Sequence, residues 1–148
     1  MEIERKFLVT SDSYKQLAVA SSHIRQGYIS REKTATVRIR ITDNQAFITI
    51  KGKPAEGHFA RYEWEKAIDR KEAEQLLSLC QGTIIDKTRW IVPAAEEGLV
   101  WEVDEFHHPQ QGLVMAEIEL TSEQQSFEKP EFIGEEVTYD PRYYNANM

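Results

Sequence analysis

Charged residues stand at every second position in many of the apolar segments of this chain of 148 residues. Two clear examples are Arg38 with Arg40 and Glu117 with Glu119, where one apolar residue separates two like charges. Side chains at positions i and i+2 of a β-strand point to the same face of the sheet. The spacing therefore predicts strands that carry charge on one face and apolar side chains on the other.

The period of two, interrupted by turn residues, predicts eight strands with a few short helices between them. We expect the strands at residues 2–9, 23–31, 35–41, 46–51, 60–68, 83–92, 99–106 and 113–121. We expect helices at residues 12–19, 70–80 and 123–127, which follow the candidate capping residues Ser11, Asp69 and Ser122. No linker divides residues 1–148, so a single domain is expected. The predicted fold is mainly β (α+β), with eight antiparallel strands closed into a barrel.

The charged strand faces have two interpretations. On a solvated sheet, ion pairs between neighbouring strands would explain each charged pair by itself. However, Lys87 and Arg89 share one face, as do Glu117 and Glu119, and like charges on one strand repel each other. Segregation of bases and acids favours the interior of a closed barrel, where bases hold a polyanion and acids hold its cations. The helix at residues 70–80 would then cover part of the apolar outer face.

The composition limits the kinds of partner, metal site and cellular location that this protein can have. The net charge of −7 disfavours a nucleic-acid partner, because a phosphate backbone needs a positive protein surface. No apolar run approaches the roughly 20 residues that cross a membrane, and the N-terminus lacks the apolar core of a signal peptide. The single cysteine, Cys80, excludes an internal disulfide and a cysteine-based zinc cluster. We therefore expect a cytoplasmic protein with a small-molecule substrate, and the sequence leaves open whether it forms a homodimer.

The charged motifs also follow one another in a distinctive order. The N-terminus carries Glu2-x-Glu4-x-Lys6. The other elements are Arg38-x-Arg40, Lys51, Glu63-x-Glu65, Lys87-x-Arg89, Asp104 and Glu117-x-Glu119. This series, which covers essentially the whole chain, resembles the CYTH, or triphosphate tunnel metalloenzyme, superfamily. With the ending Asp140 to Asn145, the chain is most similar to the short bacterial tripolyphosphatases of that family.

The resemblance implies an eight-stranded antiparallel tunnel and a role for each charged group. The phosphate-binding residues would be Lys6, Arg38, Arg40, Lys51, Lys87 and Arg89. The metal ligands would be Glu2, Glu4, Asp104, Glu117 and Glu119, while Glu63 and Glu65 would be partners of the bases. Hard oxygen ligands, without clustered cysteine or histidine, favour two Mg²⁺ or Mn²⁺ ions over zinc.

The implied activity is metal-dependent hydrolysis of a phosphoanhydride bond in inorganic tripolyphosphate or another linear triphosphate. Glu2, Glu4 and Lys6 would act at the reacting end. Tyr28 would either pair with Lys6 and assist proton transfer or serve only as a barrel aromatic. Three alternatives remain open: a class IV adenylyl cyclase, a thiamine triphosphatase, and a polyphosphate-binding module without turnover. The clustered carboxylates favour an enzyme over the module, because binding a polyanion requires only the bases.

Overall fold

Ten strands and two α-helices make up the regular structure of the computed structural model, which describes residues 1–148. The strands are β1 (Glu2–Val9), β2 (Ala20–Glu32), β3 (Ala35–Ile41), β4 (Ala46–Gly52), β5 (Ala60–Arg61), β6 (Glu63–Ala67), β7 (Gln81–Pro93), β8 (Val100–His108), β9 (Val114–Glu119) and β10 (Ile133–Glu136). The helices are α1 (Tyr14–Leu17) and α2 (Arg70–Ser78), and two short 3-10 helices, Pro141–Tyr143 and Asn145–Asn147, end the chain. No helix is both long enough and apolar enough to span a membrane.

The barrel closes because one predicted strand pairs with two different neighbours. The sheet runs in the order β10-β1-β9-β8-β7-β2-β3-β4-β6, and β5 pairs with β1. Only Tyr62 separates β5 from β6, so β5 continues the ring to β1 while β6 pairs with β4. β5 and β6 together correspond to the predicted strand at residues 60–68. The predicted ring of eight antiparallel strands is therefore confirmed, and β10 is an additional strand.

β10 extends the sheet beside the second half of β1. Phe7 of β1 is opposite Glu136, whereas Glu2, near the start of β1, is opposite Arg61 of β5. Gly134 allows β10 to approach closely, because a Cβ atom at this position would lie 2.7 Å from the side chain of Thr10. The four residues of β10 show no alternation of charged and apolar side chains. This explains why the period-two pattern did not predict it.

The apolar faces of the strands point outward and are covered, as predicted. Ala73 and Leu77 of α2 pack against Ile39 and Ile41 of β3. A larger cluster lies on the opposite side of the barrel, under α1 and the segment that precedes β10. Its buried members are Phe7, Tyr14, Val92, Leu99, Trp101, Val103, Ala116, Ile118, Leu120 and Phe132. The hydrophobic core of the molecule therefore lies around the barrel wall, which leaves much of the interior to charged side chains.

The helix predictions were partly correct. α2 begins at the predicted residue, where the side chain of Asp69 accepts a hydrogen bond of 3.1 Å from the backbone nitrogen of Lys71. α1 is shorter than predicted, and the helix predicted at residues 123–127 is wrong, because this segment is a turn followed by irregular chain. There the side chain of Gln125 accepts hydrogen bonds from the backbone and hydroxyl of Thr121, at 2.6 and 2.8 Å. Such local side-chain bonds compete with helix formation.

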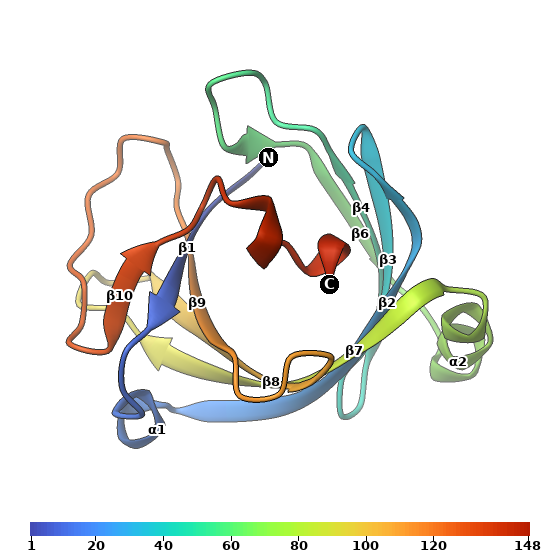
Figure 1. Ribbon diagram of the computed structural model, residues 1–148, viewed down its shortest axis with the longest axis horizontal. Coiled ribbons are helices and arrows are strands. Elements are labelled where there is room, and N and C mark those ends of the chain that lie inside the picture. Colours follow the sequence, from blue (N-terminus) through green and yellow to red (C-terminus); the bar gives the residue numbers. More distant parts are fainter.

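The barrel interior changes in character along its length. An apolar cluster lies at one end and consists of Tyr28, Ile85, Phe106, Met115 and Val137. The residues after β10 pack against this cluster, and Figure 1 shows this C-terminal segment, in red, lying across the ring of strands. The rest of the interior holds buried charged groups, namely Glu2, Lys6, Arg38, Lys87, Arg89 and Asp104. The prediction that the charged faces point inward is thus confirmed.

Candidate active site

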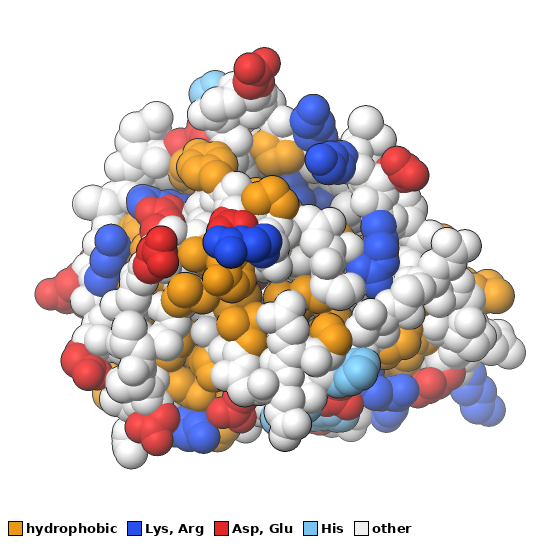
Figure 2. All heavy atoms as spheres, in the orientation of Figure 1, with side chains coloured by type: hydrophobic (Ala, Val, Ile, Leu, Met, Phe, Trp, Pro, Cys, Tyr) orange, Lys and Arg blue, Asp and Glu red, His pale blue; other side chains and the backbone are white.

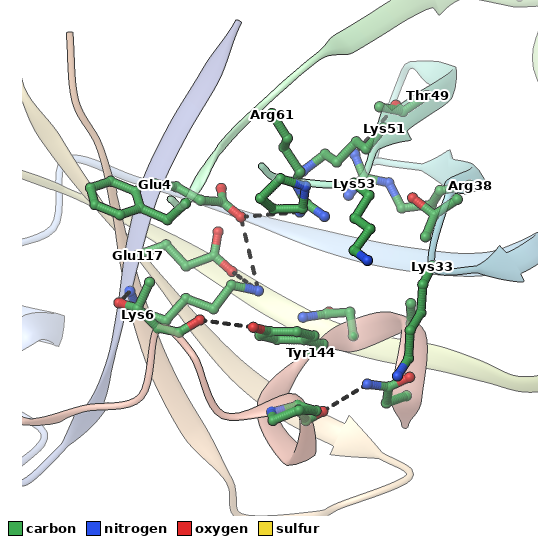
Figure 3. A pocket seen from close by; sticks show the side chains of 18 of the residues that line it. Glu4, Lys6, Lys33, Arg38, Thr49, Lys51, Lys53, Arg61, Glu117 and Tyr144 are labelled. Carbon is green, nitrogen blue, oxygen red and sulfur yellow. Dashed lines mark hydrogen bonds and ion pairs between the residues drawn. The ribbon is translucent and has the colours of Figure 1, made fainter. Parts of the chain in front are cut away.

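A cavity of about 350 Å³ occupies the charged part of the barrel interior. Figure 3 shows acidic side chains around Lys6 on one side of this cavity and basic side chains on the other. Glu4 and Glu117, from β1 and β9, lie together on one side, whereas Arg38 and Lys51, from β3 and β4, lie on the other. Side chains alternate between the two faces of a strand. Because the apolar face of each strand points outward, these charged side chains point inward. The fold therefore brings Glu4 and Glu117 to one side of the cavity, the acidic wall, and Arg38 and Lys51 to the other, the basic wall.

The basic wall contains a guanidinium group without a carboxylate partner. Nε of Arg40 donates to the amide oxygen of Gln26 at 2.9 Å, and Arg40 forms no ion pair. Burial, together with the charges of Arg38 and Arg89, lowers the pKa of Arg40 to about 9. The positive charges that face this part of the cavity are therefore only partly neutralised by the protein, and an anion would relieve their repulsion.

Two further bases are held by one buried carboxylate. Asp104 accepts hydrogen bonds from Nζ of Lys87 at 2.7 Å and from Nε and Nη2 of Arg89 at 2.7 and 2.8 Å. Burial opposes ionisation of Asp104, but the two cations outweigh it and hold the pKa of this carboxyl well below its usual range. Both oxygens of Asp104 are thus engaged by bases. A metal ion at Asp104 stays a prediction, and it would compete with these three bonds.

On the acidic wall, Lys6 lies between two carboxylates. Its Nζ atom is 3.4 Å from Glu117 and 3.9 Å from Glu4. Burial opposes the charge of Lys6, but these two glutamates outweigh it and raise the pKa of Lys6. Burial also opposes ionisation of Glu4, yet Lys51, Lys6 and Arg61 hold its pKa below the ordinary value. At neutral pH Lys6 is therefore a cation and Glu4 is an anion.

The junction of β1, β4 and β5 contains further ion pairs. Glu2 accepts from Nζ of Lys51 at 2.6 Å and from Nε of Arg61 at 3.1 Å. Glu63 lies 3.5 Å from Lys51, and Glu65 lies 3.8 Å from Arg38. Glu63 and Glu65 therefore contact bases, while Glu2 is already paired with two cations. As a metal ligand, Glu2 would have to exchange these partners for the ion.

The remaining carboxylates of the acidic wall repel one another. Burial, followed by the charges of Glu117 and Asp104, raises the pKa of Glu102, even though Arg89 opposes this shift. Burial, followed by the charges of Glu2, Glu4 and Glu102, raises the pKa of Glu119. The structure contains no group of three carboxylates already arranged around one point. The side chains nevertheless fit a divalent cation, because an ion among these oxygen ligands would relieve their repulsion.

The predicted pairing of Tyr28 with Lys6 is not present. Tyr28 is buried in the apolar cluster at one end of the interior, and no hydrogen bond joins it to Lys6. The ring of Tyr144 lies 5.3 Å from Nζ of Lys6 instead (Figure 3). Tyr28 still lines the cavity, so its catalytic role stays a prediction.

The sequence analysis did not identify two polar residues of the site, Gln26 and Asn145. Gln26 accepts from Arg40, and Asn145 accepts from Lys87 at 2.9 Å. Gln26 could have been identified from the sequence, because it is a polar residue at an inward position of β2. The segment that contains Asn145 has no periodic pattern, so its entry into the barrel had no signal in the sequence.

The basic wall continues to the outside of the cavity. Lys33 and Lys53, in the connections that follow β2 and β4, line its edge and are exposed. In Figure 2, basic side chains gather at the upper right of the visible face, over the region of β3 and β4 in Figure 1. A polyanion that approaches the cavity would therefore meet positive charge first on this side.

The closed antiparallel barrel and its interior of opposed acids and bases define a β-barrel protein with a charge-lined tunnel. The chain belongs to the CYTH domain family, whose model matches residues 1–144. Membership of this family of tunnel metalloenzymes implies dependence on a divalent metal ion.

Relatives of known name cover nearly the whole chain. It is 45% identical to an inorganic triphosphatase of Acetivibrio thermocellus, over 99% of this chain and 92% of that protein. It is 35% identical to an inorganic triphosphatase of Nitrosomonas europaea, over 99% of this chain and 95% of that protein. The crystal structure of an inorganic triphosphatase matches with a TM-score of 0.67 and 32% identity, over 99% of this chain and 93% of that chain. A Hippeastrum protein at 19% identity, with a TM-score of 0.66 over 82% of this chain and 80% of that chain, shares the fold.

Proposed function

We propose that this protein is an inorganic triphosphatase, which hydrolyses a phosphoanhydride bond of tripolyphosphate inside the barrel. The observation that carries the proposal is the partly buried guanidinium of Arg40, which has no carboxylate partner and lies among other cations in a cavity that is also lined by Glu4 and Glu117. A guanidinium offers several donors in one plane, which suits the oxygens of a phosphate group. The two inorganic triphosphatases that resemble the chain over nearly its full length support the same activity.

In this proposal the basic wall binds the phosphate chain. Arg38, Arg40, Lys51, Lys87 and Arg89 donate hydrogen bonds to its oxygens, and Lys6 binds at the reacting end. The raised pKa of Lys6 keeps it protonated at neutral pH, so it stabilises negative charge and does not act as a base. The raised pKa of Arg89 likewise keeps that residue charged.

The acidic wall binds two Mg²⁺ or Mn²⁺ ions in the same proposal. Glu4, Glu117 and Glu119 would provide oxygen ligands, and Glu2 would join them only by giving up its contacts with Lys51 and Arg61. Bound divalent ions neutralise phosphate charge and favour deprotonation of a nearby water. In the reaction a water would add to a phosphorus atom as the anhydride P–O bond breaks, its proton would pass to bulk solvent, and phosphate and pyrophosphate would leave. Glu4 is ionised at neutral pH and is suited to orient the water.

The first test is phosphate release from tripolyphosphate, ATP and thiamine triphosphate with Mg²⁺, Mn²⁺ or EDTA. We expect metal-dependent release that is fastest from tripolyphosphate. Glu4→Gln should lower the rate on the order of a hundredfold, the scale seen when one group that stabilises a transition state is lost. Glu97→Gln is the matched control, since this exposed loop residue loses the same charge far from the strands of the acidic wall.

Other outcomes of this assay would support one of the three alternative functions instead. Conversion of ATP to cyclic AMP and pyrophosphate, without hydrolysis of tripolyphosphate, would identify an adenylyl cyclase. Faster release from thiamine triphosphate would identify a thiamine triphosphatase. Tight binding of tripolyphosphate with no turnover under any metal condition would leave a polyphosphate-binding module.

A further inference from the structure

Two neutral amides are buried between the bases of the cavity. Gln26 is fully buried on β2, and Asn145 is 9% exposed at the start of the last 3-10 helix. Nε2 of Gln26 donates to Oδ1 of Asn145 at 3.0 Å, which joins residues that are 119 positions apart in the sequence. The amide pair therefore ties the end of the chain to the barrel wall.

The same two amides each hold one base of the site. Oε1 of Gln26 accepts from Nε of Arg40 at 2.9 Å, and Oδ1 of Asn145 accepts from Nζ of Lys87 at 2.9 Å. A continuous chain of hydrogen bonds thus runs from Arg40 through Gln26 and Asn145 to Lys87. Both bases line the cavity, whereas Gln26 lies behind it.

These contacts orient the bases without neutralising them. Arg40 and Lys87 are like charges, and the charge of Arg40 is among the causes that lower the pKa of Lys87, after burial. Asp104 contacts Lys87 at 2.7 Å, whereas Arg40 has no carboxylate partner and, without Gln26, would move away from Lys87 in response to this repulsion. Lys87 is thus also held by Asp104, but a carboxylate beside Arg40 would cancel charge that a phosphate could use. An amide oxygen fixes the donor and carries no net charge.

We propose that Gln26 and Asn145 are positioning residues that hold Arg40 and Lys87 at the spacing needed to bind two oxygens of a phosphate chain. The inference rests on the proposed function, because it assumes that both bases bind the phosphate chain of the proposed substrate. The C-terminal segment is then part of the binding site and not only a cover for the barrel.

Two substitutions at Asn145 alter its contact with Lys87 in different ways. Asn145→Ala removes the acceptor, and Asn145→Asp keeps an acceptor but adds a negative charge beside Lys87. We expect both changes to raise KM for tripolyphosphate about tenfold, the scale of one hydrogen bond to a charged group, with kcat changed less than about twofold. Asn145 lies outside the strands, so neither variant removes a pairing between two strands of the barrel.

Gln26→Met, of similar shape, tests the other amide, and Gln75→Met on the exposed surface of α2 is its matched control. We expect the Gln26 variant to raise KM and the control to leave both kinetic constants unchanged. Circular dichroism and thermal melting establish that each variant is folded. If Gln26→Met does not fold, the two Asn145 variants alone test whether the amide pair positions the bases.

A binding experiment makes the result independent of turnover. Titration calorimetry with tripolyphosphate in EDTA should show weaker binding by both Asn145 variants than by the wild type. If the wild type binds in this way but hydrolyses nothing, the proposed function fails and the positioning role stands. Unchanged KM and Kd in the folded variants would overturn the positioning role, as would a wild type that does not bind tripolyphosphate. Tighter binding by Asn145→Ala would also overturn it, because Asn145 would then compete with phosphate for Lys87.

Discussion

Inward charges of this chain are stabilised by specific partners, and Asp104 is the clearest case. It accepts three hydrogen bonds from Lys87 and Arg89, and all three side chains are nearly inaccessible to solvent. Removing the carboxylate leaves Lys87 without a counter-ion and leaves Arg89 with Glu102 alone. Asp104 therefore contributes to stability through the bases that it holds.

At the residue scale, Asp104→Asn should lower the free energy of unfolding at pH 7 by about 3–5 kcal/mol, measured by urea denaturation in EDTA. Asp86→Asn breaks an exposed pair with His23 and should cost less than about 1 kcal/mol. The folded pKa of Asp104 is depressed, so its contribution is present above the unfolded pKa of about 3.9 and is lost as the pH falls. The difference between wild type and variant should therefore shrink below about pH 4. A difference that is small at pH 7, or that does not change with acid, would contradict this assignment.

At the scale of elements, helix α2 and strands β3 and β4 form one packed unit. Leu77 is 7% exposed and packs with Ile39 and Ile41 on the outer side of β3, whose inner side carries Arg38 and Arg40. The helix therefore buries the apolar side of the strand that presents two of the phosphate-binding candidates. Because β3 is paired along its whole length with β4, the basic wall depends on this outer packing.

Leu77→Ala should lower the free energy of unfolding by about 2–5 kcal/mol, because it leaves a cavity between α2 and β3. Leu79→Ala is the matched control, since Leu79 is 67% exposed near the end of the same helix, and we expect a change within about 0.5 kcal/mol. Urea denaturation measures both values. Equal effects of the two substitutions would show that α2 does not cover the sheet as described.

At the scale of the whole molecule, the closed ring brings acids and bases from distant parts of the chain into one cavity. β1 and β9 provide the acidic wall, while β3, β4 and β7 provide most of the basic wall. Most strands contribute one kind of charge to the inner face, and β1, which carries Lys6 beside Glu4, is the exception. A divalent cation bound between strands would stabilise the folded ring but not the unfolded chain.

We therefore expect Mg²⁺ or Mn²⁺ alone to raise the melting temperature. At a free ion concentration of 100 times Kd, the gain is about 2.7 kcal/mol, and EDTA should reverse it. Glu119→Gln should reduce the gain, whereas Glu97→Gln, which loses an exposed charge, should leave it intact. A stabilisation that is identical in both variants would place the ion elsewhere on the molecule.

The local period-two pattern was sufficient to predict the strands and the face on which each of their side chains lies. The bounds predicted for β1 and β3 agree with the structure, and the alternation of Arg38 with Arg40 correctly indicated an inward face. The reason is physical: the side-chain period of a strand is two, and apolar faces must be buried. The order of charged motifs also led to the family, because each motif lies on a different strand of the ring.

Contacts between distant residues were decided only by the tertiary structure. The split of one predicted strand at Tyr62, the pairing of β10 with β1, and the entry of Asn145 into the barrel depend on segments without a periodic signal. The sequence pattern also did not predict the partner of each charged side chain. Asp104 contacts bases, and Lys6 contacts Tyr144, only after the ring has closed. A sequence period determines which face a side chain occupies, whereas its partner depends on how the strands are ordered and where the chain ends.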